Sequence, residues 1–222
     1  MNEIRINNFQ QFHNALAKYK DDTEWIFRGQ GKSSWKLVPK AGRHPYNKAN
    51  DEEFFLAWKR RATEFIDIEK YDDWNLLAIA QHYGFATRLL DWTHNPLIAG
   101  YFAVSKYYDS DAVIYAYLNH KSVFAQDNNL FSRRGIYKFM PNGDIQRIVR
   151  QCATFTVHGP ATISLEENIE DKCCLEKIII DKNYRKGLLF DLSYYGVNRL
   201  SLFPDLDGLS VYMNWHMQND NS

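Results

Sequence analysis

The sequence predicts an α+β fold in which a mixed or antiparallel core sheet is flanked by several helices. Four stretches are rich in β-forming residues or alternate in polarity, as strands do: residues 23–30, 112–118, 150–159 and 175–181. Other stretches carry apolar residues at helical spacing. The chain has 222 residues and 45% hydrophobic content, so it is long enough to bury a sizeable core.

The charge of the chain is balanced, because 27 basic side chains match 27 acidic ones. No overall field therefore draws it to nucleic acid or to an anionic membrane, although local basic patches remain open. The first residues lack the basic and apolar regions of a signal peptide, and no apolar run is long enough to cross a bilayer. We therefore expect a cytoplasmic protein with no membrane partner. The three cysteines are not spaced as a disulfide framework or a zinc site, and we assign no metal ligands.

The first expected elements are a helix and a strand. Residues 7–20 place apolar side chains at helical spacing after Asn8, a suitable N-cap. Residues 23–30 predict a core strand that ends at Gly29. Arg28 lies at the end of this strand, where its guanidinium can bind a phosphate or a carboxylate through two hydrogen bonds. A structural ion pair with an aspartate suits this arginine equally well, and the segment alone leaves both roles open.

Two helices are expected next. Residues 51–69 predict an amphipathic helix. Its expected inward residues are Phe54, Phe55, Trp58, Ala62, Phe65 and Ile66. Residues 72–83 predict a second helix, capped by Asp72 or Asp73. His82, near its C-terminal end, can interact with the helix dipole, but it also lies at the entrance to the polar segment that follows.

Residues 81–103 have a dense set of polar side chains followed by an apolar helical pattern. We expect an extended stretch over residues 87–90, a tight polar turn over residues 91–95 and a helix that begins at Pro96. Asn95 is well suited to cap this helix. A turn that opens a helix presents free backbone N–H groups and the positive end of the helix dipole, and both favour an anion such as a phosphate. The sequence therefore predicts a ligand-binding corner.

The rest of the chain continues the α+β pattern. Residues 119–148 are polar and irregular, and we expect a loop that faces the substrate. Residues 181–196 predict a helix closed by Gly196. An exposed acidic turn at Asp205 and Asp207 is expected before a short final helix.

Several of these segments resemble the FRG domain family, which is named for a Phe-Arg-Gly sequence found here at Phe27, Arg28 and Gly29. The matching segments are IFRGQ at 26–30, AQHYGFATRLLDWTHNPLIAGYFA at 80–103, FTVHG at 155–159 and GVNRLSLFPDLDG at 196–208. Where such domains usually have His-His-Gly, this chain has a tyrosine at the second position. The resemblance implies that residues 1–222 form a single FRG domain with its core at about 24–212.

The order of elements is also similar to that of ADP-ribosyltransferases of the arginine, serine and glutamate class. Arg28 matches the arginine of an early strand in these enzymes, and the segment from Asp91 to Thr93 matches their Ser/Thr corner. The resemblance implies that the chain binds NAD as a substrate, with Arg28 and the corner holding its phosphates and nicotinamide ribose. It also implies a nucleotide ligand and a protein or nucleic-acid acceptor.

The third motif of that class departs from the pattern. The strand expected to carry the catalytic glutamate offers Gln151, which supplies no negative charge. A carboxylate could come from Asp91, Asp205 or Asp207, and His158 could act as a base or hydrogen-bond the ribose. The comparison thus implies catalytic roles for Arg28, His82, Asp91, Gln151, His158 and Asp205. It implies nucleotide binding by Arg28, Gly29, Gln30, Thr87, Arg88, Trp92, Thr93 and Asn95.

Three functions are consistent with these residues. The first is an ADP-ribosyltransferase-like enzyme that uses NAD, in a toxin or a phage-defence effector. The second is a nucleic-acid-binding module or metal-dependent nuclease. Its site would gather His82, Arg88, Asp91, His158 and Asp205. The third is a non-catalytic interaction domain, in which Asp91 pairs with Arg28 or Arg88 in a buried network.

Overall fold

The computed structural model describes residues 2–120, 122–123, 130–141, 150–171 and 173–219. Its core is an eight-stranded sheet with the order β1-β8-β4-β2-β3-β7-β6-β5. The strands are β1 (Glu3–Ile6), β2 (Trp25–Gln30), β3 (Leu89–Thr93), β4 (Ala112–Leu118), β5 (Ser122–Val123), β6 (Gly135–Phe139), β7 (Ala153–Gly159) and β8 (Cys174–Ile180). The β1/β8 and β5/β6 pairs are parallel and the other pairs are antiparallel. The predicted α+β fold with a mixed sheet is therefore confirmed.

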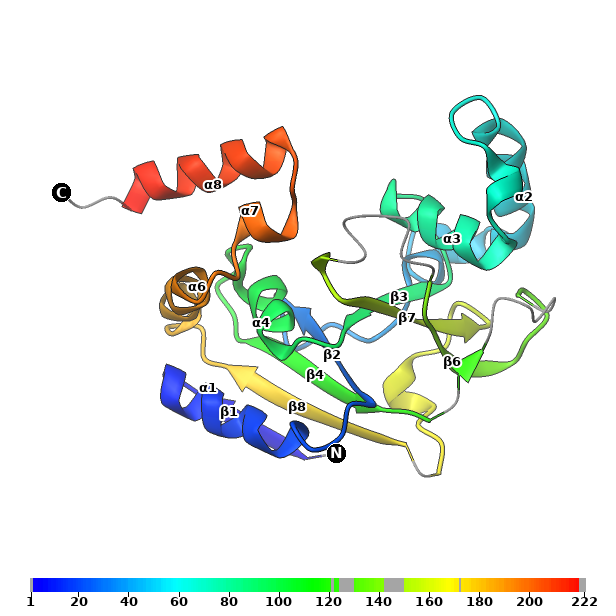
Figure 1. The fold of residues 1–222 in the computed structure, drawn as a ribbon. Coiled ribbons are helices and arrows are strands. Elements are labelled where there is room, and N and C mark those ends of the chain that lie inside the picture. The colour runs from blue at the N-terminus through cyan, green and yellow to red at the C-terminus, as the bar shows by residue number, and fades with distance from the viewer. Residues whose placement is uncertain (1, 121, 124–129, 142–149, 172, 220–222) are drawn as a thin grey trace.

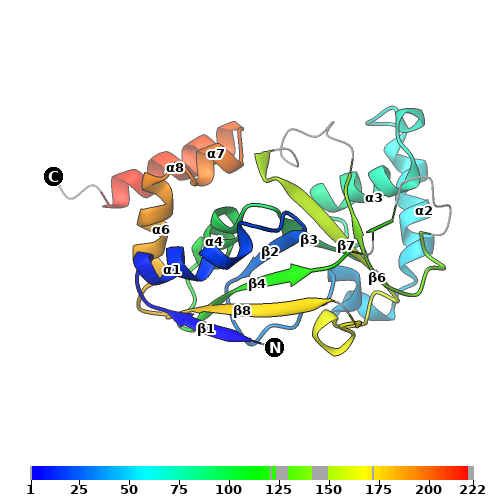
Figure 2. The ribbon, with the colours of Figure 1, turned by 60° about the horizontal axis from the view of Figure 1, so that its bottom comes forward.

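The sheet has a seam between β2 and β3. Strand β2 pairs with β4 along its whole length, from Trp25 to Gln30, but with β3 only through Phe27 and Thr93. The seam separates a first half (β1-β8-β4-β2) from a second half (β3-β7-β6-β5), and both are visible in Figure 2. Apolar side chains from both halves meet in one cluster that includes Ile26, Tyr115, Leu90 and Trp92. The two halves therefore face each other across this cluster.

The helices cover the outer faces of the two halves (Figure 1). Helices α1 (Phe9–Leu16), α4 (Pro96–Val104) and α6 (Arg185–Tyr194) pack on the first half. Helices α2 (Asp51–Ala62) and α3 (Asp73–His82) pack on the second half. The chain ends in α7 (Arg199–Leu202) and α8 (Leu206–Asn219), and α8 runs away from the sheet. In the described part of the chain, the helices are too short or too polar to span a membrane.

The predicted helix ends are confirmed where a side chain or a glycine fixes them. The Asn8 side chain accepts a hydrogen bond from the amide of Gln11 and caps α1, and the Asp72 side chain accepts one from the amide of Asn75 and caps α3. Gly196 follows α6 with a φ of 80°, a conformation that favours glycine at this position. These helix ends depend on residues that are close together in the chain, so they can be predicted from the sequence.

Three expectations about the elements were wrong, and one strand was not predicted. Helix α2 ends at Ala62 rather than near residue 69, so Phe54 and Phe65 are 58% and 78% exposed instead of inward. Strand β3 extends over the predicted turn, because pairing with β7 holds it extended as far as Thr93. Strand β6 lies in the predicted loop at 119–148, much of which falls outside the described residues. Strand β1 was not predicted, because three of its four residues are exposed.

Candidate functional site

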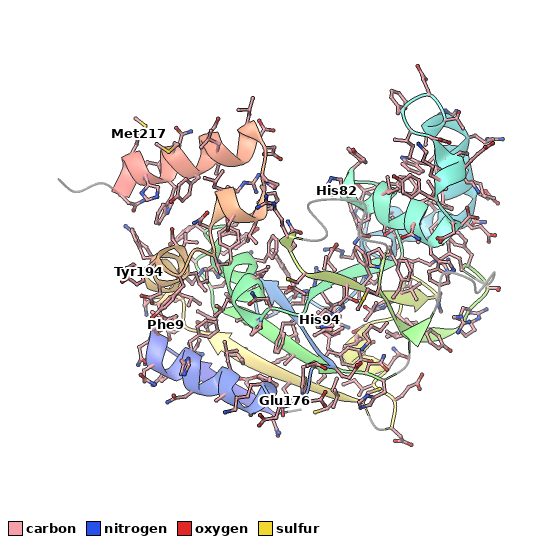
Figure 3. The ribbon with its side chains drawn as sticks, in the orientation of Figure 1. Phe9, His82, His94, Glu176, Tyr194 and Met217 are labelled. Atoms are coloured by element: carbon pink, nitrogen blue, oxygen red, sulfur yellow. The ribbon has the colours of Figure 1, made fainter. Side chains whose placement is uncertain are left out.

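A cleft of about 890 Å³ lies beside the seam of the sheet, within the range of about 300–1,000 Å³ found for small-molecule sites. One wall is the end of β2, with Arg28, Gly29 and Gln30. The opposite wall is β3 with Asp91, Trp92 and Thr93, and the C-terminal end of α3, where Figure 3 labels His82. The cleft forms here because β2 and β3 are no longer hydrogen-bonded beyond the Phe27–Thr93 pair.

Arg28 connects the two walls. Its Nη1 atom donates a hydrogen bond to the main-chain oxygen of Asp91 at 2.7 Å and lies 3.6 Å from the Asp91 Oδ2 atom. Burial lowers the pKa of Arg28, and the nearby charge of Asp91 opposes this shift. The guanidinium remains a cation, because an arginine side chain is not deprotonated in proteins. Its side chain is 17% exposed, and its Nε atom has no partner among the described residues. Arg28 is thus a desolvated cation that the protein pairs only in part, and it lines the cleft.

Asp91 is held in place by a short relay of side chains. Thr87 Oγ1 donates to Gln81 Oε1, and Gln81 Nε2 donates to Asp91 Oδ1 at 2.7 Å. The Asp91 side chain is nevertheless 62% exposed and lines the cleft. The relay fixes the orientation of this carboxylate while leaving it accessible. Gln81 was not among the predicted site residues, although the sequence places it at the end of α3 and at the start of the polar segment.

The cleft is strongly cationic. Five lysine or arginine residues line it, and among the described lining residues Asp91 is the single acid. The cations are Arg28, Lys36, Lys40, Arg43 and Lys106. Such a lining favours an anionic ligand, because fixed positive charges at a partly enclosed surface concentrate negative charge there. The other four cations, Lys36, Lys40, Arg43 and Lys106, were not among the predicted site residues.

One known protein family matches part of the chain. The model of the FRG domain matches residues 23–112, which include β2, its Phe-Arg-Gly sequence, β3 and α4. This segment of the chain therefore resembles an FRG domain. No curated protein and no solved structure matches the chain. The matched region supplies both walls of the cleft, whereas β7 and β8, which pair with β3 and β4, lie outside it.

Other predicted site residues also line the cleft. Trp92 donates from Nε1 to Thr156 Oγ1 at 2.9 Å, and Thr93 donates from Oγ1 to the main-chain oxygen of Gln151 at 2.7 Å. Gln151 and Gln30 are lining residues as well, and the buried Oε1 atom of Gln30 has no partner among the described residues. Of the predicted nucleotide-binding residues, the structure therefore brings Arg28, Gly29, Gln30, Trp92 and Thr93 together.

Asn95 and Thr87 serve the scaffold. The Asn95 side chain accepts a hydrogen bond from the amide of Leu97 at 2.9 Å and caps α4, as predicted. The Asn95 amide itself donates to Thr93 Oγ1. Neither Asn95 nor Thr87 lines the cleft, and the role of Thr87 is to orient Gln81. The predicted start of α4 is therefore present, but the polar groups of Thr93 and Asn95 there bond to the protein itself.

Arg88 does not line the cleft, contrary to the prediction. Its Nε and Nη2 atoms donate to the two carboxylate oxygens of Asp51, each at 2.7 Å, and Nη1 donates to the main-chain oxygen of Phe131 at 2.9 Å. The guanidinium also stacks on the Phe131 ring, with 4.4 Å between its central carbon and the ring centroid. Arg88 therefore fastens α2 to the second half of the sheet.

His158 is also structural. It is fully buried, its Nδ1 lies 3.0 Å from the main-chain oxygen of Ile163, and its Nε2 lies 3.1 Å from Thr156 Oγ1. Because Trp92 donates to that hydroxyl, the hydroxyl can donate to Nε2, which leaves Nδ1 as the donor to Ile163. Burial lowers the pKa of His158 to about 4, which keeps the ring neutral. The predicted role of His158 as a base in the cleft is therefore wrong.

This histidine should make the stability of the domain depend on pH. The folded-state pKa lies below the reference value of 6.5, so the unfolded chain binds a proton that the folded chain does not. The unfolding free energy should therefore fall by about 2 kcal/mol from pH 7 to pH 5 through this group. Urea denaturation at pH 7 and pH 5 measures this fall in unfolding free energy, with His158→Gln as the control. An equal loss in both proteins would show that other groups cause the dependence.

Asp205 caps a helix and does not reach the cleft. Its Oδ1 accepts a hydrogen bond from the amide of Gly208 at 2.6 Å, at the start of α8. Asp207 lies in the first turn of the same helix, which is longer than the short helix expected. The acidic turn was predicted to precede the final helix, whereas Asp207 lies inside that helix. The predicted catalytic residue Asp205 does not line the cleft.

The proposed nuclease site does not assemble. Of its five candidate residues, His82 and Asp91 line the cleft, whereas Arg88, His158 and Asp205 lie elsewhere. Over the described ranges, no three histidine, cysteine, aspartate or glutamate side chains are grouped so that they could hold a metal ion.

Proposed function

We propose that the cleft binds NAD and that the domain is an ADP-ribosyltransferase-like enzyme. The observation that carries the proposal is Arg28, a desolvated guanidinium that the protein pairs only in part at one wall of a cationic cleft. A guanidinium in this state favours a phosphate, because its planar fork can donate two charge-assisted hydrogen bonds to one. The pyrophosphate of a dinucleotide meets this requirement.

Asp91 is the residue that we propose for the chemistry. Transfer breaks the bond between the nicotinamide nitrogen and ribose C1′, and nicotinamide leaves with the bonding electrons. A carboxylate beside C1′ stabilises the positive charge that develops there, and it can accept the proton of the attacking acceptor. Asp91 is accessible and is oriented by Gln81, which suits both roles.

Gln151 does not replace the missing glutamate. Its side-chain Nε2 donates to the main-chain oxygen of Leu202 at 3.2 Å, although the residue lines the cleft. We therefore assign Gln151 a structural or ligand-contacting role. In our proposal, Asp91 supplies the negative charge that the missing glutamate would carry. The setting that we propose, a toxin or a phage-defence effector, rests on the family resemblance alone.

NAD binding by calorimetry tests the proposal. We expect the wild-type chain to bind NAD, and Arg28→Ala to weaken binding by about 10- to 100-fold, because a hydrogen bond to a charged group contributes about 1.5–3 kcal/mol. Arg28→Lys keeps the charge without the fork and should also lose affinity. Arg61→Ala, which removes an exposed arginine on α2, is the matched control.

Circular dichroism separates the outcomes. A folded Arg28→Ala variant with weakened binding supports a nucleotide site. A variant that unfolds would instead support the interaction domain, in which Arg28 and Asp91 form an internal pair. If Arg28→Ala unfolds, Arg28→Lys is used instead, because it retains the positive charge. Its NAD affinity then shows whether binding depends on the planar guanidinium. Absence of NAD binding by the folded wild-type chain would overturn the proposal.

A further inference from the structure

One stretch of the chain departs from the neutral composition of the whole. Residues 25–50 contain no aspartate or glutamate and include six lysine or arginine residues. Two aromatic side chains of this stretch, Trp35 and Tyr46, are each 42% exposed. Large aromatic surfaces of this kind are usually buried in a core, so exposed rings among cations indicate a binding surface.

Two lysines of this stretch lie against aromatic rings. Lys32 Nζ lies 5.9 Å from the centroid of the Trp35 ring and 5.3 Å from that of Tyr108, and the two rings meet edge to face at 5.3 Å. Lys40 Nζ lies 5.4 Å from the Tyr46 ring. We call these residues the basic aromatic strip: Lys32, Trp35, Lys36, Lys40, Arg43, Tyr46 and Tyr108.

The strip runs into the cleft. Five of its seven residues line the cleft, and the other two, Lys32 and Tyr46, lie against the lining residues Trp35 and Lys40. Lys36 is paired with Glu167 at 2.6 Å, but both side chains are more than 60% exposed. Such exposed pairs contribute little free energy, so Lys36 can exchange this partner for a phosphate. Among the described residues, no acid forms an ion pair with Lys40 or Arg43.

We propose that the basic aromatic strip binds single-stranded nucleic acid and presents it to the cleft as the acceptor. Lysine and arginine would bind the backbone phosphates, and bases would stack on Trp35 and Tyr46, as in proteins that bind single strands through cations and aromatic platforms. A single strand is favoured over a duplex because stacking on the rings requires unpaired bases. It is favoured over an acidic protein because carboxylates would use the cations but not the exposed rings.

The acceptor role rests on the proposed function, whereas binding of the strand does not. Binding is therefore measured without NAD, by fluorescence anisotropy of a short fluorescein-labelled oligodeoxythymidine at low ionic strength. We expect Trp35→Ala to weaken binding about tenfold or more, since one stacked base contributes about 1–3 kcal/mol. Lys40→Ala should weaken binding and reduce its salt dependence, because one phosphate contact is lost. Tyr194→Ala and Lys59→Ala are the controls. Tyr194 is 87% exposed on α6, outside the strip (Figure 3). Lys59 lies on α2, also outside the strip.

The outcomes separate this inference from the proposed function. If the oligonucleotide binds but NAD does not, the strip is supported and the enzyme is not. If NAD binds but the oligonucleotide does not, the strip proposal is overturned. The proposal is also overturned if Trp35→Ala behaves like Tyr194→Ala. Equal competition by duplex DNA or by polyglutamate would likewise overturn it, because neither ligand offers unpaired bases for stacking.

Discussion

Replacing Gly29 with alanine is expected to destabilise the domain by at least about 3 kcal/mol, the upper end of the usual range for overpacking a core. A Cβ atom on Gly29 would overlap the main-chain oxygen of Ala99 and lie 2.6 Å from the amide nitrogen of Ala103. Both groups belong to the backbone of α4, which cannot move locally as a side chain can. The helix would have to shift off β2, and this would disturb the buried contacts of Ile98.

Urea denaturation followed by circular dichroism measures this effect. Gly187→Ala is the control, because its added Cβ would lie 3.0 Å from the Tyr184 ring, a partly exposed side chain that can move. Alanine is also favoured over glycine in a helix by about 1 kcal/mol, which offsets that crowding. A small loss in Gly29→Ala, similar to that of the control, would show that α4 does not depend on this close approach.

Replacing Arg88 with alanine is expected to destabilise the fold by about 3–5 kcal/mol, since it breaks a buried ion pair from one side. Arg88 is 95% buried, and its loss leaves the partly buried carboxylate of Asp51 without its bidentate partner. The main-chain oxygen of Phe131 loses its donor as well. Arg88→Lys should show an intermediate loss, because an ammonium group keeps the charge but not the planar fork.

A double-mutant cycle isolates the pair. The unfolding free energies of Arg88→Ala, Asp51→Ala and the double variant give the coupling energy between the two side chains. We expect the double variant to be less destabilised than the sum of the single variants, because no carboxylate is then left unpaired. Simple additivity would mean that Arg88 acts through its stacking on Phe131 rather than through Asp51.

The sequence predicted those features that depend on near neighbours in the chain. The N-caps at Asn8, Asp72 and Asn95 were correct because each cap bonds to an amide two or three residues away. The core strands were correct because alternation or apolar runs mark them locally. The place of Arg28 at the end of β2 was also readable, since a charged residue follows a buried apolar run there.

The sequence did not predict which polar residues meet across the fold. Arg88 and His158 carry the same chemical groups whether they bind a ligand or a main-chain oxygen, and only the tertiary structure shows that Asp51 and Ile163 are their partners. Lys40 was missed for a different reason, because nothing in its local sequence indicates a site. It follows β2 in what looks like a connecting loop, and the cleft that it lines is created by the separation of β2 and β3.

The strand order has a consequence for the way the chain is synthesised. Strand β8 lies between β1 and β4, so β4 has two neighbours in the sheet, β2 and β8. Strand β2 is made before β4, but β8 is available only after residue 180 has left the ribosome. Until then, the apolar AVIYAYL segment of β4 has an open edge, the kind of surface through which nascent chains aggregate. A ribosome-bound chain that ends after residue 112 contains β2 and β3 but lacks their main partners, β4 and β7. Strands β2 and β3 pair with each other through only one pair of residues. We therefore expect the sheet to fold late in translation, and during that interval the open edge of β4 is a surface that chaperones can bind.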